Sequence, residues 1–515
     1  MKRNRLAIAA GSFALLVIGG CQLLPGQEEQ RPIVIGTANA LTSFDPAGAY
    51  DNGSWAVFSN VYQSLLTFEA GSPSPRPDVA ETCGFTDSAL RTYRCELRDG
   101  VVFSNGNPVS AAAVKHSFDR ILRIRHPLGP GPLFANLRSV EARGSFVTFH
   151  LRTADATWPH KIATGAGSIV DPAEFPLDRL RGNASAVGSG PYVVTSYRKG
   201  EAIDLASNPA YKGAVTRKRV PVNIRYYPTA QDVEKAWKAG TIEVAYSGLP
   251  SAALERLDPR DPDVSLSVGE SAHARYLVMN LRSARNPLKD VAARRAVAAL
   301  VDRGRLAGEV FRYTVTPLYS LVPQGVVGHN TAFLDAYPEA DPRYAAQRLR
   351  SAGITTPVPI TLGHQTGTAA LEAGELKRQL ETDGLFEVEL VEERDWDAYQ
   401  NRYQRGEFDA FVSAWIPDFA DPETFVQPLV GTGNVLHNGY TSTEVDTAIR
   451  NTQRHSDRGQ SVPQFWSIQD AVARDVPLVP LWQKKNHVVT RSTVIGGHHL
   501  AEGNAIWRLW ELRRL

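Results

Sequence analysis

The first 20 residues constrain the chain most, because they decide where the rest of it folds. Three basic residues within the first five positions are followed by an apolar run over residues 6–18 and by Gly19 and Gly20. A basic head, a short apolar segment and small residues before a cut site are typical of a secretory signal. The apolar run is shorter than the ~20 residues that a membrane span needs. Residues 1–20 are therefore predicted to be a signal peptide, and the remainder is expected to fold outside the cytoplasm.

Cys21 follows this segment directly, and the segment together with Cys21 resembles a bacterial lipobox. That resemblance implies cleavage before Cys21, attachment of diacylglycerol to its sulfur, and a lipid anchor in the membrane. Residues 21–31 would then be a lipidated tether. The alternative is an ordinary secreted protein with a chance cysteine at the cut site. Both interpretations place the working part of the protein outside the cytoplasm.

The other two of the three cysteines, Cys83 and Cys95, flank a short polar segment that suits a hairpin. In an extracytoplasmic protein such a pair predicts a disulfide. Closing a loop of this size stabilises the fold by roughly 2–3 kcal/mol in the chain-entropy model. A pair of metal thiolates is the competing interpretation, but no Cys-x-x-Cys motif or nearby histidine supports it.

Length and charge narrow the possible functions further. At ~100–200 residues per domain, a chain of 515 residues predicts two or three lobes, each with its own core. The formal net charge is only +2, which gives no sign of a nucleic-acid surface. No second apolar run approaches the length of a membrane span.

The pattern of apolar residues predicts an α/β protein. Residues 222–227 form a predicted strand, Thr229 caps a predicted helix that stops at Gly240, and residues 242–246 form the next strand. Similar alternation returns between residues 358 and 415. These strand–helix–strand units indicate a sheet covered by helices.

Motifs for catalysis or metal binding are missing from the sequence. It contains no His-Glu-x-x-His zinc motif, no Gly-x-Ser-x-Gly nucleophile elbow and no phosphate-binding loop of the Walker type. Their absence lowers the expectation of catalysis, and neither a metal site nor a cofactor is predicted.

Five segments in a fixed order resemble one known family. They are residues 97–120, with Leu97-Arg98-Asp99-Gly100 at the start; 188–192, Gly-Ser-Gly-Pro-Tyr; 280–303; 408–422; and 475–481. Together they resemble the extracytoplasmic solute-binding proteins of peptide-type ABC importers, the oligopeptide- and dipeptide-binding family 5 or cluster C. The resemblance extends over nearly the whole mature chain.

The resemblance implies a two-lobed fold of the type II periplasmic-binding-protein class. Lobe one would comprise residues 32–272, with an extra subdomain at 77–187, and lobe two residues 273–484. Residues 485–515 would return to lobe one, so the chain would cross between the lobes twice.

The resemblance also implies a function. The protein would capture peptides between its lobes and deliver them to ABC permease subunits in the membrane, acting as a monomer. Nothing in this scheme breaks a bond, so no enzymatic activity is expected. Alternatives within the family are a nickel chelate, haem or a sugar as ligand. Two alternatives of other classes are a lipid-anchored hydrolase of the cell surface and a former importer subunit that signals or holds other proteins.

Five residues form the ligand-binding site that the resemblance implies. An aspartate three positions after the cleft tryptophan binds the peptide amine in relatives, and Asp418 has that place after Trp415. Trp415 would form a wall of the pocket, and Phe419 belongs to the same segment. Ser54 and Trp55 begin a helix that lines the cleft from lobe one.

Several residues near this site leave alternatives open. Asp421 is the rival amine anchor, although its position before Pro422 suits a turn. Pro417 directly precedes Asp418, which restricts the backbone and can redirect the carboxylate. The group that binds the peptide carboxylate is not assigned, and His364 and Arg394 are weak candidates for it.

Overall fold

The computed structural model describes residues 31–182, 185–215, 219–246, 248–258, 260–283, 285–502 and 506–515. The chain divides into two compact units, Met1–Arg31 and Pro32–Leu515. The predicted signal peptide, Cys21 and nearly all of the tether lie outside the described residues, and the following account concerns the second unit. None of the described helices combines the length and the hydropathy needed to cross a membrane.

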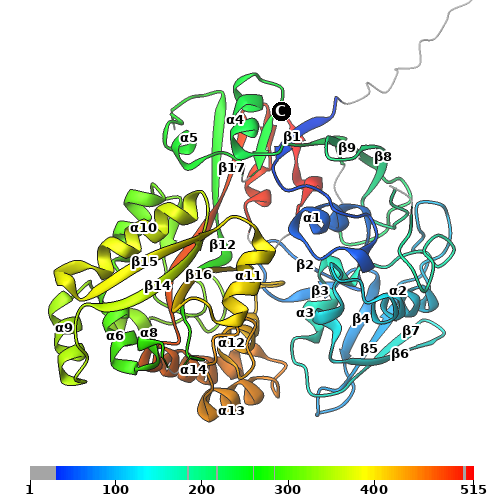
Figure 1. The fold of residues 1–515 in the computed structure, drawn as a ribbon. Coiled ribbons are helices and arrows are strands. Elements are labelled where there is room, and N and C mark those ends of the chain that lie inside the picture. The colour runs from blue at the N-terminus through cyan, green and yellow to red at the C-terminus, as the bar shows by residue number, and fades with distance from the viewer. Residues whose placement is uncertain are drawn as a thin grey trace, which may run out of the picture. The chain divides into compact units, whose positions relative to one another are not determined.

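One mixed sheet runs through the second unit (Figure 1). Eleven strands of the described residues form it, and β13 (Val315–Pro317) pairs with β17 outside the main path. The order along the path is β15 (Phe386–Glu393), β14 (Val358–Gln365), β16 (Ala410–Trp415), β12 (Val264–Met279), β17 (Leu478–Arg491), β11 (Val244–Tyr246), β1 (Ile33–Thr37), β10 (Val222–Tyr226), β9 (Ala202–Ser207) and β8 (Tyr192–Arg198).

The predicted strand–helix–strand unit is present in this sheet, between β17 and β9. Strands β10 and β11 lie parallel on either side of β1, whose five residues are all buried. Helix α4 (Ala230–Lys238) connects them, and the hydroxyl of its N-cap Thr229 accepts a hydrogen bond from the Asp232 amide, as the capping signal predicts. A small cluster of buried apolar residues joins α4 to the sheet.

A separate sheet contains the two cysteines. Its order is β4 (Ala80–Phe85), β5 (Thr92–Leu97), β7 (Phe146–Leu151) and β6 (Leu137–Arg143). Cys83 and Cys95 are opposite each other on β4 and β5, and a disulfide joins them. The hairpin and the disulfide predicted from the cysteine spacing are thus both present. Helix α2 (Ala111–Ile124) begins after the N-cap Ser110, whose hydroxyl accepts a hydrogen bond from the Ala113 amide.

Among the described residues, the remaining strands form two small pairs, and the remaining α-helices number twelve. The small strand pairs are β2 (Leu66–Phe68) with β3 (Pro75–Pro77) and β18 (Val494–Ile495) with β19 (Arg513–Arg514). The other helices are α1 (Asn52–Val61), α3 (Trp158–Ile162), α5 (Ser251–Glu255), α6 (Val291–Leu300), α7 (Arg303–Arg305), α8 (Ala332–Ala336), α9 (Pro342–Ser351), α10 (Thr368–Leu380), α11 (Trp396–Arg405), α12 (Glu423–Val430), α13 (Thr443–Thr452) and α14 (Val462–Asp475).

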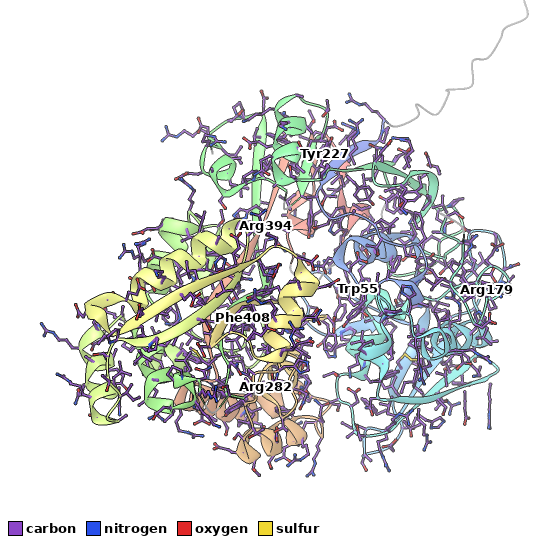
Figure 2. The ribbon with its side chains drawn as sticks, in the orientation of Figure 1. Trp55, Arg179, Tyr227, Arg282, Arg394 and Phe408 are labelled. Atoms are coloured by element: carbon purple, nitrogen blue, oxygen red, sulfur yellow. A yellow bond between two sulfur atoms is a disulfide. The ribbon has the colours of Figure 1, made fainter. Side chains whose placement is uncertain are left out.

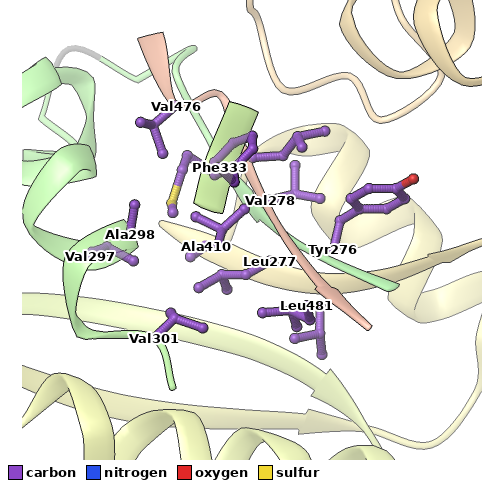
Figure 3. Close-up of a cluster of buried hydrophobic side chains, with 14 of the residues drawn as sticks. Tyr276, Leu277, Val278, Val297, Ala298, Val301, Phe333, Ala410, Val476 and Leu481 are labelled. Atoms are coloured by element: carbon purple, nitrogen blue, oxygen red, sulfur yellow. The ribbon is translucent and has the colours of Figure 1, made fainter. Parts of the chain in front are cut away.

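Two large hydrophobic cores are separate from each other. The first core collects buried residues between 33 and 246 and between 488 and 512, together with Phe419. The second core collects buried residues between 272 and 482, and Figure 3 shows its centre, where Leu277 and Val278 of β12 lie near Val297 of α6 and Leu481 of β17. Each half of the sheet is therefore stabilised by its own apolar interior.

Strands β12 and β17 connect the two halves. They pair antiparallel along most of their length and run side by side from one half to the other (Figure 1). The register shifts between the pairs Glu270–Lys485 and Ala274–Gln483, so residues 271–273 oppose the single residue Lys484. This β-bulge lies at the boundary between the residues of the two cores.

Candidate functional site

The segment after β16 brings the two halves into contact. Phe419 follows strands and precedes helices of the second core, yet its side chain is only 3% exposed and packs in the first core. Its ring lies 5.5 Å from the ring of His160 in α3, measured between centroids. Residues 416–419 are therefore positioned where the halves meet.

Asp418 contacts the first half through its carboxylate. The hydroxyl of Tyr50 donates a hydrogen bond of 2.6 Å to its Oδ1 atom. Burial raises the pKa of Asp418, while this hydrogen bond and the nearby Lys161 ammonium act in the opposite direction. Burial, with the Asp418 charge next, also keeps the pKa of Tyr50 well above its ordinary value, so the phenol remains protonated.

Trp55 lies beside this contact. Its ring packs edge-to-face against Tyr50 with centroids 5.4 Å apart. Figure 2 shows Trp55 on the side of its half that faces the other half. Asp418 and Trp55 line one small cavity together with residues of α1 and the segment 163–168. The indole Nε1 atom is buried and has no hydrogen-bond partner among the described residues.

A larger cavity of about 600 Å³ continues from this one into the first half. Both cavities have Tyr62, Gln63 and Asp78 in their walls. Charged side chains of both signs line the larger cavity, among them Arg76 and Arg508. Burial raises the pKa of Asp78 to about 6 despite hydrogen bonds from the Ala214 amide and the Gln63 side chain. The combined space is polar and suits a ligand with polar groups and a backbone.

Ser54 organises the loop that precedes α1. Its side chain is fully buried, and its hydroxyl oxygen accepts a hydrogen bond of 3.1 Å from the Thr42 amide. Asp51 caps α1 by accepting a hydrogen bond from the Ser54 amide at 2.8 Å. Ser54 therefore fixes the path of the loop that carries Tyr50, and it is not among the residues that line the cavities beside Asp418.

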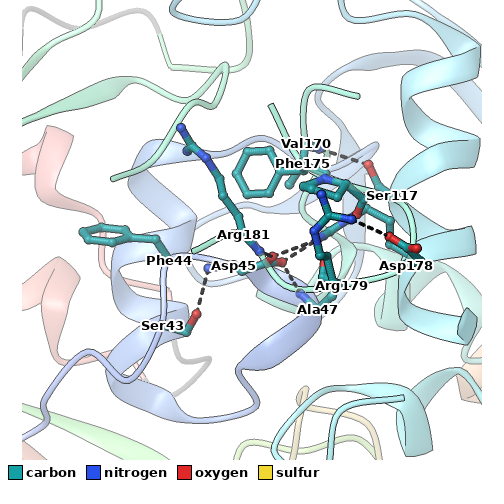
Figure 4. Close-up of polar contacts among 12 residues, drawn as sticks. Ser43, Phe44, Asp45, Ala47, Ser117, Val170, Phe175, Asp178, Arg179 and Arg181 are labelled. Carbon is teal, nitrogen blue, oxygen red and sulfur yellow. Dashed lines mark hydrogen bonds and ion pairs between the residues drawn. The ribbon is translucent and has the colours of Figure 1, made fainter. Parts of the chain in front are cut away.

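A buried ion pair fixes the start of the same loop (Figure 4). Both carboxylate oxygens of Asp45 accept hydrogen bonds from the guanidinium of Arg120 in α2, at 2.8 and 2.7 Å. The amides of Ala47 and Arg181 also donate to Asp45, at 3.0 and 2.7 Å. The side chains of Arg120 and Asp45 are only 1% and 2% exposed. Such full pairing is what a buried charge requires.

Trp415 and the two weak candidates for carboxylate binding have other partners. The Trp415 indole donates a hydrogen bond of 2.7 Å to the Thr424 carbonyl, and its ring packs against the second core. His364 is 4% exposed, with a ring nitrogen 2.8 Å from the Gln365 carbonyl. The Arg394 side chain is 86% exposed and lies 3.8 Å from Glu392. The roles of Trp415, His364 and Arg394 stay predictions.

The carboxylate of Asp421, the rival anchor, is buried and hydrogen-bonded to other groups of the protein. Its carboxylate accepts two hydrogen bonds from Arg458, at 2.7 and 3.0 Å, and one from the Glu423 amide at 2.9 Å. It is 2% exposed. A carboxylate with these partners has little capacity left for a ligand, so the geometry favours Asp418 as the anchor.

Glu423 makes the stability of this region depend on pH. Burial, and next the charge of Asp421, raise its pKa to about 8, although Arg458 and the Thr452 hydroxyl act in the opposite direction. A carboxyl whose pKa is higher in the folded than in the unfolded state takes up a proton on folding. Its stabilising contribution is complete below the unfolded pKa near 4.5 and is lost as the pH rises through about 8.

We predict that Glu423→Gln removes this dependence. The variant should gain free energy of unfolding relative to the unaltered protein as the pH rises from 5 to 8, by up to ~1.4 kcal/mol per pH unit. Urea unfolding at each pH measures the difference. Glu81→Gln, which changes an exposed carboxylate of β4, is the control and should give a flat difference. Parallel curves for Glu423→Gln and the unaltered protein would contradict the prediction.

No group of three or more His, Cys, Asp or Glu side chains placed to hold a metal ion occurs in the part of the chain that the structure describes. Sequence reasoning missed Tyr50 and the Asp45–Arg120 pair. Arg120 ends the segment 97–120 that resembles the family, but nothing in that segment indicates its partner, and Asp45-Pro46 has the local pattern of an ordinary turn. The only signal in the sequence was the polar loop before α1.

Comparisons with known proteins identify the family to which this chain belongs. The model of the family described as "Bacterial extracellular solute-binding proteins, family 5 Middle" matches residues 74–436. The probable D,D-dipeptide-binding periplasmic protein DdpA of Escherichia coli is 27% identical over 480 residues, covering 90% of each chain. Heme-binding protein A of Haemophilus influenzae is 26% identical over 479 residues, covering 86% of each chain.

Among solved structures, the periplasmic binding protein DppA of Helicobacter pylori, in complex with the peptide STSA, has a TM-score of 0.77 at 21% identity and covers 94% of this chain and 98% of its own. This likeness identifies the fold, which is of the type II periplasmic-binding-protein class, as predicted. Since the family match extends over more than half of its length, the chain belongs to family 5 of the bacterial extracellular solute-binding proteins, the binding components of ABC importers for peptides and related ligands.

Proposed function

We propose that this protein captures peptides with a free amino terminus and delivers them to an ABC permease. The observation that carries the proposal is the Asp418 carboxylate, which lies at the contact between the two halves and has a raised pKa. An ammonium group offers only donors and is costly to bury without an anion. Asp418 supplies that anion. It lines the small cavity beside Trp55, which adjoins the larger cavity of about 600 Å³.

Tyr50 couples amine binding to the arrangement of the halves. Its hydroxyl already donates to Asp418, so a ligand ammonium would share the carboxylate with it or displace it. The unpartnered Nε1 atom of Trp55 offers a further donor for a ligand carbonyl. A ligand held by residues of both halves stabilises the closed arrangement more than the open one, which is the requirement for closure on binding.

We further propose the lobes that the sequence predicts. Lobe one would comprise residues 32–272 and 485–515, with 77–187 as its extra subdomain, and lobe two residues 273–484. The separate cores support this division, and the β-bulge at residues 271–273 supports a hinge at the crossing of β12 and β17. Bulges bend strands and weaken the ladder locally.

The proposal also states where the protein is located and that it binds its ligand without catalysis. Lipidation at Cys21 would keep it at the outer face of the cytoplasmic membrane, next to the permease. The Cys83–Cys95 disulfide supports an oxidising compartment. The relatives named above are binding proteins, and we propose that this chain likewise binds its ligand without catalysing a reaction.

Mass spectrometry of co-purified ligands tests the proposal. The protein would be purified from a producing cell under native conditions and then unfolded gently to release what it holds. We expect masses and fragment spectra of short peptides, absent from Asp418→Asn purified in parallel. Release of haem, a metal chelate or a sugar in place of peptides would contradict it and identify the alternative ligand.

A further inference from the structure

A third cavity, of about 170 Å³, lies at the crossing of β12 and β17. Ile416 and Pro417 line it, whereas the next residue, Asp418, lines the cavity beside Trp55. Its polar lining consists of Asn39, Asn52, Ser271, His273, Lys484 and Asn486. Among the described residues, no aspartate or glutamate contributes to its wall. The cavity is therefore polar and contains a positive charge without a negative one.

Lys484 is the source of that charge. It is the residue opposite the β-bulge, and its ammonium has no hydrogen bond or ion pair within the described part of the chain. Burial lowers its pKa, which is the response of a cation that no anion compensates. The neighbouring Lys485 differs, because its ammonium donates to the Tyr313 carbonyl at 3.4 Å.

His273 is a second titratable residue in the wall of the same cavity. Its ring Nε2 atom is buried and has no partner among the residues that the structure describes. Burial, with the charges of Lys484 and Arg275, lowers its pKa to about 3, so the ring is neutral at physiological pH. Buried polar atoms in proteins are almost always paired, and one that is not indicates a missing partner.

We propose that this cavity binds a carboxylate of the ligand, with Lys484 as the charged partner and His273 as an N–H donor. The inference rests on the proposed function and deepens it, because it assigns the ligand's negative group. A carboxylate accepts several hydrogen bonds, and charge-assisted ones are the stronger kind. Asn39, Asn52 and Asn486 supply further amide donors around it.

The position of the cavity limits which carboxylate it receives. Adjacent Cα atoms are ~3.8 Å apart, so the wall formed by Pro417 and the anchor Asp418 are immediate neighbours. A ligand whose ammonium pairs with Asp418 and whose chain runs past Pro417 would present its first residues to this cavity. Two sources fit: the terminal carboxylate of a dipeptide, or an acidic side chain near the amino terminus of a longer peptide.

Calorimetric titration with four peptides tests the proposal and separates the two sources. Ala-Ala against Ala-Ala amide isolates the terminal carboxylate, and Ala-Glu-Ala amide against Ala-Gln-Ala amide isolates the side chain. We expect the protein to prefer the carboxylate member of at least one pair by about 10- to 100-fold. Lys484→Met should abolish that preference while leaving the affinity for the uncharged member within about threefold.

Lys485→Met is the matched control, since it removes the adjacent lysine of the same strand and should retain the preference. Thermal unfolding of each variant confirms that it is folded. A protein that binds both members of each pair equally, or a Lys484→Met variant that keeps the preference, would overturn the inference and leave the proposed function intact. If none of the four peptides binds the unaltered protein, both proposals fail together.

Discussion

Asp418→Asn is expected to weaken the binding of peptides with a free amino terminus by about 100-fold or more, and to leave N-acetylated peptides almost unaffected. Losing one partner of a buried, hydrogen-bonded charge pair costs ~2–5 kcal/mol, since the other charge is left unpaired. Asparagine keeps the shape of the side chain and the contact with Tyr50, so the effect isolates the charge. Titration calorimetry with Ala-Ala-Ala and its N-acetyl form measures it.

The direction of the Asp418 pKa gives a second measurement of the same role. Because burial raises this pKa, the carboxylate becomes protonated at a higher pH than an ordinary aspartate. Amine binding should therefore weaken as the pH falls through that raised pKa, and the Asn variant should lack this dependence. Asp397→Asn, an exposed change in α11, is the control. Equal losses for acetylated and free peptides would remove Asp418 from the proposed role.

Separate replacement of Arg120 by Met and of Asp45 by Asn should each lower the free energy of unfolding by about 3–5 kcal/mol. Each change leaves a buried charge without its partner, and the remaining desolvated ion has no access to water. Urea unfolding followed by tryptophan fluorescence measures the loss. Lys115→Met on the same helix is the control, because its pair with Asp119 is partly exposed and should contribute less than ~1 kcal/mol.

The double variant Asp45→Asn with Arg120→Met refines this prediction. It removes both charges, so its loss should be smaller than the sum of the two single losses. Additive losses would show that the ion pair is not the source of the effect. Since Asp45 fixes the loop that carries Tyr50, both single variants should also bind peptide more weakly at temperatures where they remain folded.

Local signals in the sequence predicted local structure well. Thr229 caps the helix expected of it, and strands β10 and β11 lie within the predicted ranges 222–227 and 242–246. These features depend on neighbours within a few residues, which the sequence displays directly. The Cys83–Cys95 hairpin belongs to the same class, because two strands and a short connection specify it.

Contacts between distant residues could not be predicted in this way. Phe419 packs in the first core although its neighbours along the chain pack in the second, and its apolar character alone does not say which. Tyr50 and Asp418 are 368 positions apart, and the sequence around either residue does not indicate that the two are in contact. The full length of β12 was also missed, since the exposed residues at its start lack the alternation of a half-buried strand. The family resemblance supplied Asp418, and the geometry supplied its partner.

The paired strands β12 and β17 have a mechanical consequence. A two-stranded ribbon resists bending within its own plane, because that motion would stretch every hydrogen bond along one edge, but it twists and flexes out of plane at little cost. The irregular register opposite Lys484 concentrates this compliance at one point. If the proposed hinge lies at this point, the two bodies that the ribbon joins would be restricted to a narrow set of relative rotations, and their facing surfaces would approach a ligand along nearly the same path each time.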